Sequence, residues 1–211
     1  KAWVAAKAIT VTVDELPYEP NNGYLGMQKT DVSIKSLYDD KNVYYLITYK
    51  DPTQSMARFP WVKQADGSWK KLANKDDTGH DNTYYEDKFA MFWNISTKGF
   101  EGEGCMVACH LDEPGDTSAG RKYTDSAEET IDMWHAKYVR SMPMGMFDDQ
   151  YVNNNTDPKK NKGWGRNGDT GKGGYHNNDN ADKSAPAFMN LNGTEEEMYY
   201  VIPSKKIPFV D

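Results

Sequence analysis

The first part of the chain alternates hydrophobic and polar residues with the two-residue period of a β-strand. Residues 8–13 and 32–37 follow this pattern and are rich in β-branched side chains. Residues 43–49, Val-Tyr-Tyr-Leu-Ile-Thr-Tyr, come after a short polar turn. The pattern predicts that 32–37 and 43–49 pair as an antiparallel hairpin, which ends at Asp51-Pro52.

The middle of the chain contains one clear strand and one ambiguous segment. Residues 88–95 predict a buried strand. In residues 125–140, Ser126 is a suitable N-cap for a short helix, whereas residues 131–139 alternate as a strand would. In the strand alternative, Trp134 and His135 point to opposite faces, and Lys137 shares the face of His135. The residues alone leave both alternatives open.

The last third of the chain is mostly polar. Residues 148–185 are rich in Asn, Asp, Gly and Lys and predict a long polar loop. Asp148 and Asp149 fit no EF-hand spacing, so we expect them on a solvated surface. A short strand is expected at 198–202. The patterns indicate a mainly β chain with long loops and short helices, and no shift in composition divides it. We therefore expect a single domain over residues 1–211.

Composition and charge narrow the range of functions. The formal net charge is −7 and the sequence contains no basic stripe, which argues against a nucleic-acid partner. No hydrophobic run is long enough to cross a bilayer, so we expect no membrane span. Because the sequence starts at Lys1 without Met, we expect that a leader has been removed. The protein would then be exported, to the periplasm or the extracellular space.

The segment Cys105-Met-Val-Ala-Cys109-His110 carries the clearest chemical signal. In c-type cytochromes, two thiols add to the haem vinyl groups and the adjacent histidine binds the iron. The usual gap between the cysteines is two residues and here it is three, which a small bulge in the loop accommodates. The segment predicts one covalently attached haem c, with Cys105 and Cys109 as thioethers and His110 as the proximal iron ligand.

Other interpretations of the cysteine pair stay open. The pair could close a small disulfide loop, or the two thiols could be free beside a coincidental histidine. A zinc site is poorly supported, because the chain contains only two Cys and four His for a tetrahedral shell.

Several residues compete for the distal position on the iron. His135 is the first choice, and Lys137 is its rival, although a lysine ligand must first lose its proton. Met144 and its neighbours Met142 and Met146 offer thioether ligands, or they could pack against the porphyrin. We expect Trp134 and Met144 to line the haem pocket.

The two remaining histidines lie in polar segments. His80 and His176 are flanked by Asp, Asn and Gly, so we expect them to be solvated loop residues.

Several segments together resemble the haem-binding domain shared by ethylbenzene dehydrogenase γ subunits, related subunits of dimethyl-sulfoxide-reductase-type enzymes and certain monohaem c-type cytochromes. Residues 43–53 resemble the family's strand that ends in a W-x-D-P-T turn, with Tyr49 in place of Trp. Residues 85–93 resemble its Y-E-D-R strand, and residues 132–137 its D-x-W-H-W-K segment. Residues 147–151 follow as expected.

The resemblance implies a β-sandwich similar to carbohydrate-binding modules, with one haem at one end under loops. It also implies electron transfer to or from a redox protein, such as a molybdenum oxidoreductase or another cytochrome. Relatives without the cysteine pair hold haem b through other ligands, including Lys and Met, which keeps Lys137 open as the distal ligand. The family continues with further strands, so a longer chain would extend past Asp211.

Two other functions remain as alternatives to an electron carrier. An iron with an open sixth position would suit a haem enzyme or a gas sensor. A non-haem carbohydrate-binding module would instead use exposed aromatic rings, for which Trp61, Trp69 and Trp164 are the candidates.

Overall fold

The computed structural model describes residues 2–14, 29–73, 83–110, 121–168, 175–193, 195–202 and 206–210. The chain divides into two compact units, Lys1–Gln54 and Ser55–Asp211. A single domain over residues 1–211 stays a prediction, since compactness alone does not test whether the units fold independently. Within the described ranges, no helix is long and apolar enough to cross a membrane.

The first unit is a three-stranded antiparallel sheet. A short helix α1 (Ala2–Ala5) precedes the strands β1 (Ala8–Val13), β2 (Thr30–Tyr38) and β3 (Val43–Thr48), which lie in the order β1-β2-β3. The predicted hairpin is confirmed, because β2 and β3 pair antiparallel. Its turn is closed by the Asp39 carboxylate, which accepts hydrogen bonds from the backbone N–H groups of Lys41 and Asn42.

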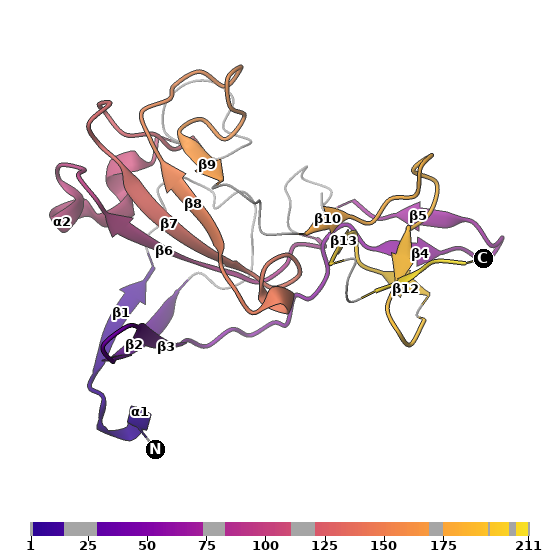
Figure 1. Cartoon of the computed structure of the whole chain (residues 1–211), viewed down its shortest axis with the longest axis horizontal. Coiled ribbons are helices and arrows are strands. Elements are labelled where there is room, and N and C mark those ends of the chain that lie inside the picture. The colour runs from indigo at the N-terminus through magenta and orange to yellow at the C-terminus, as the bar shows by residue number, and fades with distance from the viewer. Residues whose placement is uncertain are drawn as a thin grey trace. The chain divides into compact units, whose positions relative to one another are not determined.

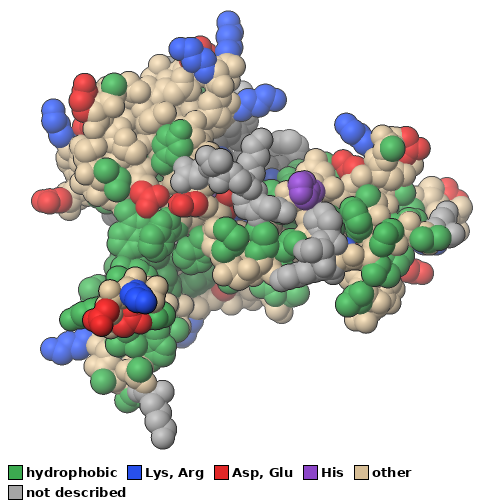
Figure 2. Space-filling view, in the orientation of Figure 1, with side chains coloured by type: hydrophobic (Ala, Val, Ile, Leu, Met, Phe, Trp, Pro, Cys, Tyr) green, Lys and Arg blue, Asp and Glu red, His purple; other side chains and the backbone are tan. Residues whose placement is uncertain are grey.

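One face of this sheet carries hydrophobic side chains that reach the surface. Ile9, Val11 and Val13 on β1 are exposed. They pair with Ile34, Val32 and Thr30 of β2 and therefore point to the same side as these residues. Figure 2 shows hydrophobic side chains gathered over this part of the chain.

The second unit is built around a four-stranded antiparallel sheet in the order β6-β7-β8-β9 (Figure 1). Its strands are β6 (Lys88–Asn94), β7 (Ile131–Lys137), β8 (Asp148–Val152) and β9 (Arg166–Gly168). The ambiguous segment is therefore a strand. β7 pairs with β6 along its whole length and with β8 from Ile131 to His135, so most of its backbone groups have a strand neighbour to bond. Its β-branched, aromatic and long side chains suit the half-buried surface.

Short elements complete the second unit. The helix α2 (Phe100–Glu103) continues into a 3₁₀ helix, η2 (Gly104–Ala108), and a second 3₁₀ helix, η3 (Met142–Met144), follows β7. Three small antiparallel sheets have the orders β12-β4-β5, β10-β13 and β11-β14. Their strands are β4 (Trp61–Lys63), β5 (Trp69–Lys71), β10 (His176–Asn177), β11 (Phe188–Met189), β12 (Glu196–Glu197), β13 (Tyr200–Val201) and β14 (Ile207–Pro208).

The prediction of a mainly β chain with few, short helices is confirmed, and the sheets are antiparallel, as the expected β-sandwich requires. The prediction of one long loop over 148–185 is wrong for part of that range, which contains β8, β9 and β10. Asn, Asp and Gly disfavour strands locally, but here they pair with neighbouring strands that tertiary structure supplies.

A tight backbone junction holds the segment that begins at Arg121. Gly165 donates to the carbonyl of Lys122 at 2.7 Å, and its own carbonyl accepts from Asn153 at 2.9 Å. A Cβ atom at Gly165 would lie 2.1 Å from the Asn153 oxygen and 2.8 Å from the Tyr123 Cα. Only glycine allows these three backbone segments to approach so closely.

We expect Gly165→Ala to lower the free energy of unfolding by about 3 kcal/mol, because the added methyl group meets backbone atoms that cannot rotate away. Urea unfolding monitored by tryptophan fluorescence would measure the change. Gly168→Ala is the matched control, since nothing lies within 4 Å of its Cβ position and its expected effect is below about 1 kcal/mol. Equal losses of unfolding free energy for both variants would show that the close backbone contacts at Gly165 do not determine the effect.

Candidate functional site

The predicted attachment motif lies at one end of the β6–β9 sheet. Cys105 is within η2 and Cys109 is the residue that ends it. Ala108, Ile131 and Val152 form a fully buried cluster, against which Phe92, Phe100 and Val107 also pack. Ile131, Val152 and Phe92 belong to β7, β8 and β6. The motif is therefore anchored on the sheet by hydrophobic contact.

Side chains on one face of this sheet form the candidate site, and we call it the site face. Directly opposed residues of an antiparallel pair point to the same side, so the register identifies the members of the face. They are Lys88, Ala90, Phe92, Asn94, Ile131, Met133, His135, Lys137, Asp148, Gln150, Val152 and Arg166. The attachment motif and the predicted distal residues His135 and Lys137 thus share one face.

Trp134 lies on the other face. It packs against Trp93 with ring centroids 5.0 Å apart and the rings tilted by 55°, and its indole N–H donates to Asp132 at 3.0 Å. Since β7 is a strand, Trp134 and His135 point in opposite directions, and Trp134 does not line the face to which His135 points. Met144, the other predicted pocket residue, is half-buried in η3, beyond the Lys137 end of β7.

The cysteines and His110 are held by pairing with a second segment. Both cysteines are free thiols of intermediate exposure, so the disulfide alternative is not realised in this structure. Cys109 forms a β-bridge with Lys122, and the His110 N–H donates to the Arg121 carbonyl at 3.0 Å. The His110 ring stacks on Tyr123 at 3.7 Å, and Nε2 lies 3.1 Å from the Tyr123 carbonyl oxygen. For Nε2 to bind iron, the ring must turn away from this carbonyl.

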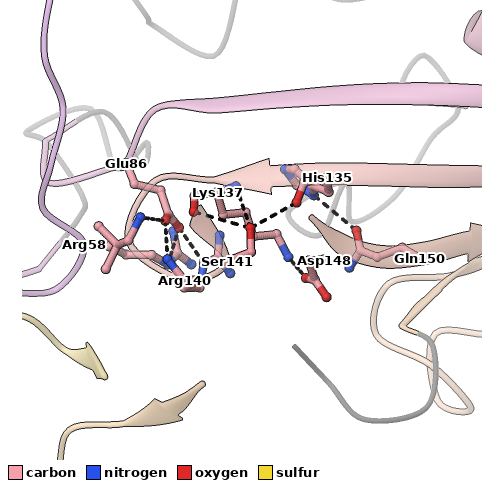
Figure 3. Close-up of polar contacts among 9 residues, drawn as sticks. Arg58, Glu86, His135, Lys137, Arg140, Ser141, Asp148 and Gln150 are labelled. Atoms are coloured by element: carbon pink, nitrogen blue, oxygen red, sulfur yellow. Dashed lines mark hydrogen bonds and ion pairs between the residues drawn. The ribbon is translucent and has the colours of Figure 1, made fainter. Parts of the chain in front are cut away.

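His135 is held in the form that binds a metal. Nδ1 lies 3.1 Å from Oε1 of Gln150, an amide oxygen that can only accept, so Nδ1 carries the proton and Nε2 offers its lone pair (Figure 3). Desolvation by burial, together with the charges of Lys137 and Lys88, lowers the pKa of His135 to about 3. The imidazole is therefore neutral at neutral pH.

Lys137 is engaged in a buried ion pair. It is 4% exposed, its ammonium group donates to the equally buried Asp148, and its backbone N–H donates to the Ser141 hydroxyl at 2.9 Å (Figure 3). Burial lowers the pKa of Lys137, and the hydrogen bond to Asp148 opposes that shift. The expectation that Asp148 belongs to a solvated surface is wrong, because the strand places its carboxylate beside the lysine.

A second carboxylate organises the end of the sheet. Glu86 is 3% exposed and accepts hydrogen bonds from the backbone N–H groups of Val139, at 2.7 Å, and Arg140, at 3.1 Å, and from the Arg140 guanidinium (Figure 3). Arg58 Nε lies 3.9 Å from the same carboxylate. The sequence patterns alone assign no role to Arg58 or Arg140, although Glu86 is part of the Tyr85-Glu-Asp-Lys segment that carries the family resemblance.

The remaining predicted residues are not part of the site face. His176 is exposed on β10, and His80 lies outside the described residues. Among the tryptophans proposed to stack on sugar, Trp61 is 2% exposed, Trp69 packs edge-on against Phe209, and Trp164 stacks on Tyr123. Their ring faces are engaged within the protein. In the described part of the chain, no cluster of three or more His, Cys, Asp or Glu could hold a metal ion by itself.

Burial of Lys88 makes the stability depend on pH. Desolvation, with the charges of Arg140 and Arg58, lowers the pKa of Lys88 to about 6 from 10.5. Between these values the unfolded chain binds a proton that the folded chain does not, so folding stability falls as pH decreases from 10.5 to 6. We expect Lys88→Met to raise the urea midpoint at pH 7 more than at pH 10.

Urea unfolding at the two pH values would measure this, with the exposed Lys159→Met as control. An equal effect of Lys88→Met at both pH values would show that the side chain acts through packing alone.

Comparison with known proteins identifies the family. No curated protein and no solved structure gives a significant match. The family model described as ethylbenzene dehydrogenase matches residues 1–207, nearly the whole chain. The match agrees with the resemblance carried by the segments around Tyr85 and Trp134, which form β6 and β7 of the site-bearing sheet. The chain belongs to the ethylbenzene dehydrogenase family.

Proposed function

We propose that this protein is a monohaem c-type cytochrome that carries electrons. In this proposal Cys105 and Cys109 hold the haem covalently, His110 is the proximal ligand and His135 the distal one. The observation that carries the proposal is the common face. The attachment motif packs against Ile131, and His135 lies on the same side of the same strand.

The side chains present fit such a group. The two thiols are free and partly exposed, which permits thioether formation. His135 is neutral, and Gln150 orients the ring through Nδ1, the kind of support that metal-binding histidines commonly have. Haem iron, when bound, supplies reversible exchange of one electron, and the role of these residues is to hold and orient it.

His135 is favoured over Lys137 as the distal ligand. The Lys137 ammonium donates to the buried Asp148 carboxylate, so using the amine as a ligand would break a buried ion pair and leave Asp148 uncompensated. His135 needs no such change, since its Nε2 already offers a lone pair. Met144, another candidate for the distal ligand, is in η3, beyond the Lys137 end of β7, and not on the strand that carries His135.

We further propose that the protein is exported, because c-type haem is attached in oxidising compartments, and that it exchanges electrons with another redox protein. A molybdenum oxidoreductase or a second cytochrome would be the partner that family membership suggests. With both axial positions filled, the iron would not act on a substrate, and the protein would be an electron carrier or subunit and not the catalytic one.

Expression with the haem c maturation machinery tests the attachment. We expect the intact mass to increase by one haem and the pyridine haemochrome spectrum to be that of haem c. Cys105→Ser/Cys109→Ser should lose the covalent haem. A colourless protein of unmodified mass would refute the proposal.

The distal ligand has its own test. We expect His135→Ala to convert the low-spin ferric spectrum to high-spin and to allow rapid carbon monoxide binding by the reduced protein. Lys137→Met/Asp148→Asn removes the rival amine without leaving a buried charge, and its spectrum should stay low-spin. A low-spin spectrum that survives His135→Ala but not the double substitution would assign Lys137 instead.

A further inference from the structure

The site face carries more positive charge than the carboxylates near it can balance. The basic side chains whose charges act on one another around its Lys137 end are Arg58, Lys88, Lys137, Arg140 and Arg166, and the carboxylates are Glu86 and Asp148. The backbone of Arg166 lies nearer the other end of the face, opposite Val152, and its side chain reaches this group. Asp148 is bound by Lys137 and Glu86 by Arg140. Three cations, Arg58, Lys88 and Arg166, are left without a carboxylate at hydrogen-bond distance within the described ranges.

Arg58 has hydrogen-bond donors that nothing satisfies. Its Nε and Nη1 atoms are buried and have no hydrogen-bond partner among the described residues, and Nε is 3.9 Å from Glu86. The guanidinium lies over the rings of Tyr85, at 4.4 Å, and Phe59, at 5.0 Å. Aromatic faces stabilise a cation only modestly, and a buried donor without an acceptor is costly. A negatively charged hydrogen-bond acceptor would satisfy these two donors.

Lys88 and Arg166 are basic groups that also have no carboxylate partner at hydrogen-bond distance among the described residues. The Lys88 ammonium is 3.0 Å from the centroid of the Tyr85 ring, and no carboxylate lies within salt-bridge distance of it among the residues described. Burial and the charge of Arg140 both lower the pKa of Arg166, and the charges of Tyr85 and Asp148 act in the other direction. The two side chains share the site face but start from opposite ends of it, since Lys88 is opposite Lys137, and Arg166 is opposite Val152 at the Ile131 end. The charges of Asp148 and Arg140 reach Arg166, so its guanidinium extends along the face toward the Lys137 end.

The position of these cations on the site face, as well as their charge, bears on what they could bind. The attachment motif packs beside Ile131, and Lys137 is six residues further along β7, about 20 Å at the rise of a strand. A haem carries its vinyl groups on one edge and its two carboxylates on the opposite edge. A haem fixed at Cys105 and Cys109 and lying over this face would turn its carboxylates toward the cluster.

We propose that Arg58, Lys88 and Arg166 form the binding site for the two carboxylate groups of the haem. The inference rests on the proposed function, because it assumes that the haem is there. Guanidinium groups bind carboxylates through paired hydrogen bonds, and an ammonium group adds a point charge. Two carboxylates would also raise the pKa of Lys88 from about 6, because a nearby anion favours the ammonium form, and the cluster would then hold four anions against five cations.

The haem carboxylates can be observed directly in the intact cytochrome. Feeding cells a 5-aminolevulinate labelled at its carboxyl carbon places ¹³C in these groups, and NMR of the reduced protein follows their ionisation with pH. The variants are Lys88→Met and Arg166→Gln. Lys88→Arg keeps the charge, and Lys159→Met, at an exposed position, is the control. Tyr85, Tyr175, Tyr200, Glu86 and Asp148 are left unchanged in all of them.

We expect the labelled carboxyls to titrate at a pH about one unit or more higher in Lys88→Met and Arg166→Gln than in the wild type, because a nearby cation favours the carboxylate. Lys88→Arg and Lys159→Met should titrate as the wild type does. Each removed cation relieves repulsion within the cluster, so both test variants should keep their fold, which their thermal midpoints would verify. Identical titrations in all variants would overturn the inference.

The outcomes separate this inference from the function on which it rests. A purified protein without a haem c spectrum would refute the proposed function and the inference together. A haem-containing protein in which the labelled carboxyls titrate alike in the wild type and in all variants would refute the inference alone. In that event, a thermal midpoint raised by added propionate in the wild type but not in Arg166→Gln would assign the cluster to a separate carboxylate ligand.

Discussion

The pairing of β7 with a strand on each side is the constraint on which the candidate site depends. A strand hydrogen-bonded along both edges cannot slip by one residue without breaking two ladders and exchanging its faces. The register puts His135, Lys137 and the Ile131 that anchors the attachment motif on one side, and Trp134 on the other. The chemistry available to this face thus follows from backbone hydrogen bonds before any side-chain contact is considered.

Desolvation is the second influence on the site face. The same burial that keeps His135 neutral also disfavours the charge of Lys88, and it makes the Lys137–Asp148 pair necessary for each partner. The site face therefore differs from an exposed protein surface. It combines two nitrogen groups whose charged forms are disfavoured, His135 and Lys88, with several cations. Water would satisfy such groups if they were exposed, and here the protein satisfies only some of them. Sites of this kind are often functional, because buried charge without a partner is seldom retained.

Much of the fold could be predicted from the sequence, because the alternation of hydrophobic and polar residues within a single strand is a local signal. The strands at 8–13, 32–37, 43–49 and 88–95 alternate strongly, and each appears within a residue or two of its expected bounds. The structure of the segment around His135 could not be settled from sequence, since Ser126 suits a helix start and residues 131–139 alternate as a strand would. The presence of β6 and β8 on either side decided it. Strands β8 and β9 were missed because their residues are polar and gain stability from neighbours distant in sequence.

The site was only partly predictable, because most of its residues are distant from one another in the sequence. Cys105, Cys109 and His110 are adjacent in sequence, so spacing alone identifies them as a possible attachment motif. Arg58, Glu86, Asp148 and Arg166 lie far apart along the chain. The pairing of β7 with β8 brings Asp148 to His135 and Lys137, whereas Glu86 joins the site through its bonds to Val139 and Arg140. The alternation of 131–139 had already separated Trp134 from His135, and a consistent use of that pattern would have removed Trp134 from the expected pocket.

The backbone junction at Gly165 bears on how fast an electron could move. Its bonds tie the strand-to-strand connection after β8 to the segment that pairs with Cys109 and His110. The backbone beside His110, the proposed proximal ligand, is therefore held at several points, and Gly165 leaves no room there for even a methyl group. A ligand on so stiff a support would shift little when the charge on its metal changes. Small movement means low reorganisation energy, the property that a carrier of electrons needs most.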